Sequence, residues 1–167
     1  MCSLLVLTAV SGAAADEIID RVLAVVAGDL IMLSDVRAAR DLGLVDPGEA
    51  PDPDRSVLLQ LIDRSLILNE VDRYAPPEPN ADAVARAIDT VRGRFVSRQA
   101  FEAALSRVGL DEGQLRATLR QNLRIRAYLD QRFVAETPER SRAIIDSWVA
   151  GLRSRAEIVD LYTPSKP

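Results

Sequence analysis

The sequence predicts a mainly α-helical fold that begins with a β-hairpin and ends with a strand that pairs back onto that hairpin. Three observations predict it: a strand-turn-strand pattern at residues 20–33, six helical patterns with start or stop signals, and a short β-branched segment at residues 156–162. An isolated hairpin is marginally stable in water. We therefore expect the terminal strand to join the hairpin in a small antiparallel or mixed sheet.

The hairpin and the first helix are predicted from their turn chemistry. Two apolar, β-branched runs flank a turn at residues 27–29, where Gly28 can adopt a positive φ without steric cost. Ser34 follows the second run, and its side-chain oxygen is expected to cap a helix over residues 34–42. Gly43 then predicts a glycine C-cap, with the hydrophobic contact made by the leucine that follows it.

Five further helices are predicted from capping residues and apolar stripes. The segment at residues 54–73 is apolar on more than one face, which is typical of a central helix. A glutamine three residues after Asp111 resembles a capping box at the start of the longest helix, which extends to about Phe133. The expected N-caps of the other four helices are Asn80, Ser97, Asp111 and Thr137. Gly109, followed by a leucine, predicts a second glycine C-cap.

The composition limits the classes of function. A chain of 167 residues, 48% hydrophobic and 28% charged, has the size of one domain. Its net charge of −4 provides no basic field for a nucleic-acid backbone. Histidine is absent and Cys2 is the single cysteine, which disfavours metal ligation and catalytic triads. We expect a protein that is not an enzyme and needs no cofactor or metal.

Residues 1–15 are predicted to be a secretory signal peptide. They carry no charge, contain an apolar run at residues 4–10 and end in three alanines, so cleavage is expected before Asp16. A short N-terminal helix is the alternative interpretation. Residues 16–167 would then form a single periplasmic domain. Stable membrane insertion is not expected, because no other segment reaches the roughly 18–20 apolar residues of a membrane span.

Four apolar side chains are candidates for a peptide-binding surface: Met32, Leu33, Phe95 and Phe101. Met32 and Leu33 end an unbroken apolar strand, in which alternate side chains face outward unless another element covers them. Phe95 continues the apolar stripe of the helix that Asn80 starts. Phe95 and Phe101 could line a groove for extended peptides, but their helical spacing is also typical of core residues. Both interpretations stay open at this point.

Arg116, Arg120 and Arg124 form a basic stripe along the longest predicted helix. Such a stripe could meet an acidic segment or anionic headgroups. Glu112 precedes Arg116 by four residues, the favourable order for an ion pair within a helix. We therefore interpret the stripe as a solvated helix face.

Several strings resemble the N-terminal chaperone module of SurA-type periplasmic proteins. The matching pieces are Asp20-Arg21-Val22 with Val25-Val26, Ile31, Ser34-Asp35-Val36 and the apolar helix at residues 58–68. The resemblance continues through Phe101 and the helix that follows it, and residues 147–149 and 159–161 resemble the family's C-terminal helix and strand. No counterpart of the family's parvulin prolyl-isomerase domain occurs between residues 133 and 137.

The resemblance implies a fold similar to the SurA N-terminal module and to the C-terminal module of trigger factor, with the terminal strand returning to the hairpin. It implies an ATP-independent chaperone that binds unfolded or extended segments of outer-membrane or secreted proteins in the periplasm. The alternative is a non-catalytic structural adaptor in an envelope assembly complex, and a prolyl isomerase is least favoured. A contiguous exposed patch at Met32, Leu33, Phe95 and Phe101 would favour the chaperone, whereas complete burial would favour the adaptor.

Overall fold

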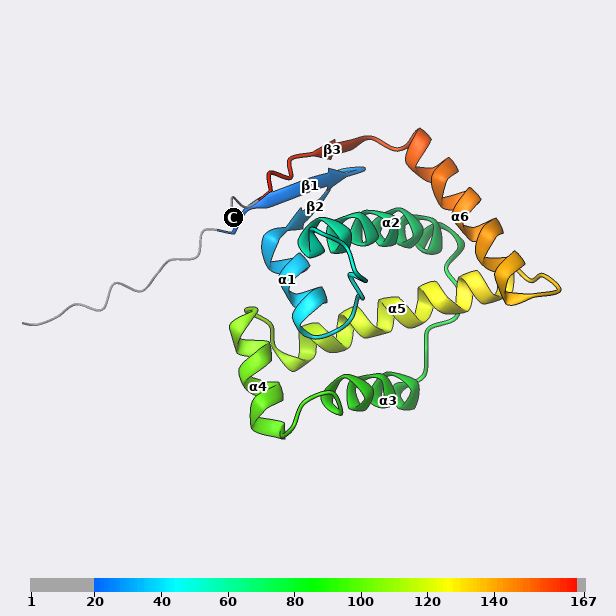
Figure 1. The fold of residues 1–167 in the computed structure, drawn as a ribbon. Helices are drawn as coiled ribbons and strands as arrows, with labels where there is room; N and C mark the ends of the chain where they lie inside the picture. Colours follow the sequence, from blue (N-terminus) through cyan, green and yellow to red (C-terminus); the bar gives the residue numbers. More distant parts are fainter. Residues whose placement is uncertain (1–19, 165–167) are drawn as a thin grey trace, which may run out of the picture.

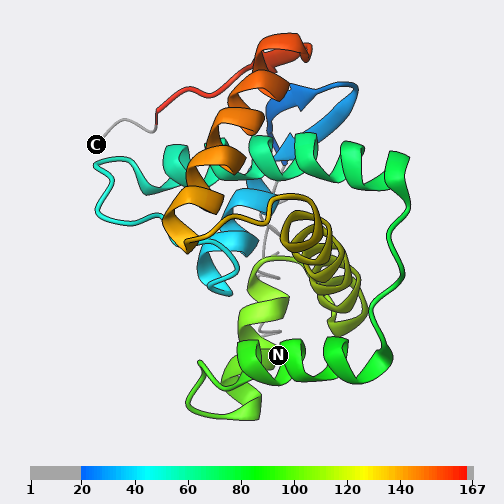
Figure 2. The same cartoon turned by 90° about the vertical axis from the view of Figure 1, so that its right-hand side faces the viewer.

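A computed structural model describes residues 20–164, so the predicted signal peptide lies outside the described residues. The elements in chain order are β1 (Val22–Val26), β2 (Asp29–Met32), α1 (Leu33–Asp41), α2 (Pro53–Tyr74), α3 (Ala81–Arg92), α4 (Arg98–Arg107), α5 (Glu112–Arg132), α6 (Pro138–Arg155) and β3 (Ile158–Asp160). Helix α5 crosses the molecule, with the sheet and α2 on one side and α3 and α4 on the other (Figure 1, Figure 2). The predicted fold class is confirmed.

The three strands form one antiparallel sheet in the order β2-β1-β3. The Ala27 N–H donates to the Glu157 carbonyl at 2.9 Å, and the Leu161 N–H donates to the Leu23 carbonyl at 2.9 Å. These two bonds extend the pairing of β1 with β3 at both ends. The predicted return of the terminal strand to the hairpin is therefore confirmed.

The hairpin turn consists of Ala27 and Gly28, with φ values of 51° and 94°. Two central residues with positive φ match the twist of the flanking strands, which is why such turns are common in hairpins. Gly28 adopts this conformation freely. Ala27 carries a Cβ, for which the left-handed region costs roughly 1–2 kcal/mol. The turn is therefore slightly strained at its first position.

Helix α1 begins one residue earlier than predicted and is capped by a distant side chain. Leu33 is its first residue, so Ser34 lies within the first turn and is not the N-cap. The Asp20 carboxylate accepts the Ser34 N–H at 3.0 Å and also the Ser34 hydroxyl. Asp35 accepts the Met32 N–H at 2.8 Å. The prediction of Ser34 as the cap is wrong because a carboxylate 14 residues earlier satisfies the helix N-terminus.

The ends of the other helices follow the predicted local signals. Each of the four predicted N-cap side chains accepts a backbone N–H three residues later, namely Asn80, Ser97, Asp111 and Thr137. Asp52 does the same at the start of α2, where no N-cap was predicted. Gly43 and Gly109 follow α1 and α4 with φ values of 64° and 71°. The leucine after each glycine donates its N–H back to the helix, to Ala39 at 2.8 Å and to Leu105 at 3.0 Å. This is the Schellman arrangement, so both predicted glycine stops are confirmed.

The buried side chains form two separate clusters. The sheet core lies between the sheet, α2 and α6, and its members include Leu23, Val26, Leu58, Ile62 and Val71. The helical core lies between α1, α3, α4 and α5, and its members include Leu42, Val84, Ile88, Phe101 and Leu115. Helix α5 contributes Leu119 to the helical core and Tyr128 to the sheet core. We call the two regions the sheet lobe and the helical lobe.

The C-terminal end of the described chain is held against the N-terminus of α2. The Tyr162 hydroxyl donates to the Asp52 carboxylate, at 2.8 Å from each oxygen. Arg55 forms an ion pair with Asp160 at 2.7 Å, and its guanidinium lies 5.4 Å from the centre of the Tyr162 ring. We call these four residues the C-terminal latch. Tyr162 and Asp160 thereby fasten β3 to α2 as well as to β1.

Among the described residues, no helix combines the length and apolar character that crossing a membrane requires.

Candidate functional site

The four residues predicted to bind peptide do not form one surface, so they show neither the contiguous exposed patch that would favour a chaperone nor the complete burial that would favour an adaptor. Phe101 is 1% exposed and is the largest fully buried side chain of the described chain. Phe95 lies in the turn after α3, not on its stripe, and its ring packs on Phe101 with centroids 5.6 Å apart. Met32 and Leu33 are partly buried, and Leu33 packs against the sheet core. Phe101 is thus a core residue, because its face of α4 packs into the helical core and leaves no surface for a peptide.

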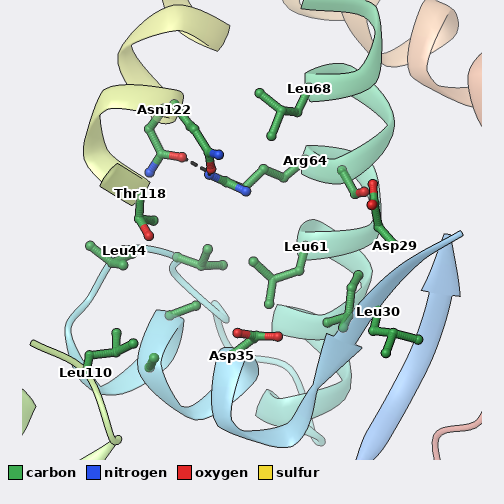
Figure 3. Close-up of a pocket in the computed structure, with 16 residues that line it drawn as sticks. Asp29, Leu30, Asp35, Leu44, Leu61, Arg64, Leu68, Leu110, Thr118 and Asn122 are labelled. Atoms are coloured by element: carbon green, nitrogen blue, oxygen red, sulfur yellow. Dashed lines mark hydrogen bonds between the residues drawn. The ribbon is translucent and has the colours of Figure 1, made fainter. Parts of the chain in front are cut away.

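A cleft of about 330 Å³ lies where the two lobes meet. Side chains from β2, α1, α2 and α5 line it, together with the loops that follow α1 and α4 (Figure 3). Its apolar lining includes Leu30, Leu44, Val45, Leu61, Leu68 and Leu110. A cleft of this size with a mainly apolar wall and a few polar groups is typical of ligand sites.

Helix α2 forms one wall of the cleft with Leu61, Arg64 and Leu68. These residues are three and seven positions apart, so they share one helix face. The adjacent face carries Leu58 and Ile62, which are buried in the sheet core. The sequence showed that α2 is apolar on more than one face, and the structure shows that the second apolar face borders the cleft. An arginine within that second stripe is the signal that sequence reasoning missed.

The free edge of the sheet forms another wall. Within the described part of the chain, β2 pairs with β1 alone. The Leu33 N–H donates to the Arg21 carbonyl, on the side of β1. The Met32 N–H points away from β1 and donates to the Asp35 carboxylate. Because backbone groups alternate along a strand, the N–H and C=O of Leu30 also point away from β1. The Leu30 side chain is 58% exposed, so β2 presents both backbone groups and apolar surface.

Arg64 is the one basic side chain that lines the cleft. Its Nε donates to the Asn122 side-chain oxygen and its Nη2 to that of Gln121, each at 2.8 Å (Figure 3). Both partners are neutral amides on α5. Burial lowers the pKa of the Arg64 guanidinium, and the charge of Asp35 partly opposes that shift. The cleft therefore contains a partly desolvated positive charge, which is stabilised by the dipoles of two side-chain amides.

The acidic groups of the cleft lie on the side of β2 and α1. Desolvation raises the pKa of Asp35, the hydrogen bond from the Met32 N–H opposes this, and the nearby Asp20 charge adds to it. Asp29, at the first position of β2, is the second carboxylate in the lining. The charges of the cleft are therefore divided, with carboxylates beside the strand and the guanidinium between α2 and α5.

The basic stripe on α5 has two different roles. Arg116 pairs with Glu112 at 3.3 Å on the helix surface, as the sequence predicts. Arg124 differs, because its side chain is only 15% exposed and it pairs with Asp72 at 2.8 Å and Glu78 at 3.2 Å. It ties α5 to the end of α2 and to the linker before α3. The interpretation of the whole stripe as a solvated face is therefore wrong at Arg124.

No protein-family model matches the sequence, and a search of curated proteins gave no significant match. Within residues 20–164, no group of three acidic, cysteine or histidine side chains is arranged to hold a metal ion. The cleft, with its strand edge and Arg64, is therefore the candidate functional site.

Proposed function

We propose that this protein is an exported, ATP-independent chaperone that binds extended apolar segments of unfolded outer-membrane or secreted proteins. The observation that carries the proposal is the apolar cleft bordered by the free edge of β2. An extended segment can pair its backbone with the outward groups of Leu30 and place alternate side chains against Leu61 and Leu68. The sequence resemblance to SurA-type chaperones supports the same function and a periplasmic location.

The size of the cleft suits reversible binding. Each apolar side chain that it buries contributes about 1.5–3 kcal/mol, and the loss of translational and side-chain freedom offsets much of that. Two or three buried side chains therefore contribute about 3–9 kcal/mol before that loss is subtracted, so the net affinity for a client segment is weak. Release requires no nucleotide, because a client that folds withdraws its apolar segment from the cleft.

Aggregation of a denatured β-barrel protein tests the proposal. The purified protein, at a modest molar excess, is expected to slow the rise in light scattering after dilution from denaturant. A Leu30→Lys variant places a charge on the exposed strand edge and is expected to abolish this protection. The matched control is Val159→Lys, because Val159 is 44% exposed on the other edge strand, β3.

Two outcomes would count against the proposal. Failure of the wild-type protein to slow aggregation would contradict a general chaperone function and favour a single-partner adaptor. Full protection by Leu30→Lys would show that clients bind elsewhere than the β2 edge. For the least favoured function, prolyl isomerisation, we expect no acceleration of cis/trans exchange in a proline peptide above the uncatalysed rate.

A further inference from the structure

The guanidinium of Arg64 has spare donor capacity on the cleft side. Its Nε and Nη2 are bound by Asn122 and Gln121, whereas Nη1 has no hydrogen-bond partner among residues 20–164. Nη1 is not among the buried polar atoms that lack a partner, so part of its surface is exposed, and the Arg64 side chain lines the cleft. Leu61 and Leu68 lie on either side of Arg64 along α2 (Figure 3). The free donor is therefore set within an apolar wall.

Arg64 is more buried than most of the described arginines that form no ion pair, and burial lowers the pKa of its guanidinium. It also differs from the arginines that do form ion pairs. Those arginines are Arg40, Arg55, Arg73, Arg92, Arg98, Arg116, Arg124 and Arg153. Each of them contacts a carboxylate, whereas Arg64 contacts two neutral amides. A partly desolvated cation without a contacting anion is incompletely compensated, and a carboxylate is the partner that a guanidinium binds most strongly.

The other charges of the cleft restrict where an anionic group can lie. Asp29 and Asp35 line the side formed by β2 and α1, so an occupant with carboxylates along its length would be repelled there. An occupant that is neutral or basic along β2 and anionic at one end avoids this repulsion. An extended apolar peptide that ends in a free α-carboxylate has this charge pattern, and its backbone can pair with the outward groups of Leu30.

We propose that the cleft preferentially binds the C-terminal end of an unfolded polypeptide, with the terminal carboxylate on Arg64 Nη1 and the preceding apolar residues against Leu61, Leu68 and the β2 edge. This inference rests on the proposed peptide binding, and it adds which end of the bound polypeptide lies at Arg64. Internal apolar segments still bind the same surface, but without the charge-assisted hydrogen bond to Arg64.

The test compares two fluorescent peptides of eight apolar residues that differ in one group, a C-terminal carboxylate or a C-terminal amide. By fluorescence anisotropy, the purified wild-type protein is expected to bind the acid about tenfold more tightly than the amide, the effect of one charge-assisted bond. Added salt should weaken binding of the acid more than binding of the amide.

Variants then assign the preference to Arg64. Arg64→Gln keeps hydrogen-bonding capacity toward α5 and is expected to bind both peptides with the wild-type affinity for the amide. Its retained binding of the amide peptide shows that the variant has folded. The matched control is Arg73→Gln on the same helix, where Arg73 is exposed and pairs with Glu70, and it should keep the tenfold preference.

Each other outcome overturns a defined part of the proposal. Equal binding of acid and amide by the wild-type protein would overturn the C-terminal preference and leave peptide binding in place. Binding of neither peptide would overturn both. If dodecanoate binds the wild-type protein more tightly than the acid peptide does, the cleft takes a fatty acid and the polypeptide proposal is wrong.

Discussion

The two lobes are stabilised by contacts that differ in how far apart the contacting residues lie in the sequence. In the helical lobe, Ser97 and Asp111 cap the backbone three residues ahead, and Gly109 ends α4 through bonds to the preceding turn. In the sheet lobe, β3 pairs with β1, and Tyr162 binds Asp52 over a separation of 110 residues. Helices α3, α4 and α5 of the helical lobe are thus specified locally, whereas α1 takes its cap from Asp20, and the sheet lobe closes only when the two ends of the described chain meet.

This difference predicts how each lobe responds to substitution. Core substitutions should affect both lobes strongly, since burial is similar in each. Removing a contact between residues far apart in sequence should destabilise mainly the sheet lobe, because no capping residue nearby in the sequence can replace that contact. The four predictions that follow test this contrast, in order of decreasing effect.

Phe101→Ala should have the largest effect, on the helical lobe. Removal of a fully buried phenylalanine should lower the free energy of unfolding by about 3–5 kcal/mol, measured by urea denaturation. Phe95→Ala is the matched control and should lose less, because Phe95 is only partly buried. Wild-type stability in Phe101→Ala, with loss of client binding, would instead make Phe101 part of the binding surface.

Asp20→Ala should have an intermediate effect, at the start of α1. Asp20 accepts the backbone N–H groups of Arg21 and Ser34 and the Ser34 hydroxyl, so its loss should cost about 1–2 kcal/mol of stability. Ser34→Ala should cost less, because the Ser34 N–H keeps its acceptor. Chemical denaturation of both variants measures the difference. A larger loss of stability in Ser34→Ala than in Asp20→Ala would indicate that Ser34 caps α1, as the sequence predicts.

The C-terminal latch should show a smaller effect that depends on pH. Desolvation, followed by the hydrogen bond to Asp52, raises the pKa of Tyr162 to about 12. The folded state therefore keeps the phenolic proton at a pH where the unfolded state, with a pKa near 10, releases it. This contribution to stability is present below pH 10 and is lost as the pH rises toward 12.

Tyr162→Phe removes that contribution and provides the measurement. The variant should be slightly less stable than the wild-type protein at pH 8, and the difference should shrink between pH 10 and 12. Denaturant midpoints at pH 8, 10 and 11.5 give the comparison. A difference that stays constant over this range would show that the Tyr162 hydroxyl does not hold β3 in place.

Ala27→Asn should have the smallest effect, and it should stabilise the hairpin. Ala27 has a φ of 51°, and asparagine tolerates the left-handed conformation better than alanine does. The Asn-Gly pair that results is favoured in such turns, so a gain of about 0.5 kcal/mol is expected in chemical denaturation. Ala27→Val is the control of opposite sign, since a β-branched residue is disfavoured at positive φ. Equal stability of the two variants would contradict the strain at this turn.

Local signals predicted most of the fold but little of the candidate site. The caps at Asn80, Ser97, Asp111 and Thr137 and the glycine stops were predicted because each involves residues three to five positions apart. Ser34 was assigned wrongly, since the competing acceptor, Asp20, is distant in sequence. Phe101 was open to two interpretations, because its spacing is the same in a core and in a groove. Arg64 was missed, because its partners lie on another helix.

The amino-acid sequence by itself determined where the helices start and stop, and it determined that a terminal strand needs the hairpin as its partner. These properties depend on backbone hydrogen bonds that nearby side chains complete and on strands that are unstable alone. Only the tertiary structure decided which apolar faces are covered, because burial depends on the neighbours that pack against a residue. The second face of α2 borders a cleft for this reason, and Arg64 faces that cleft with a donor to spare.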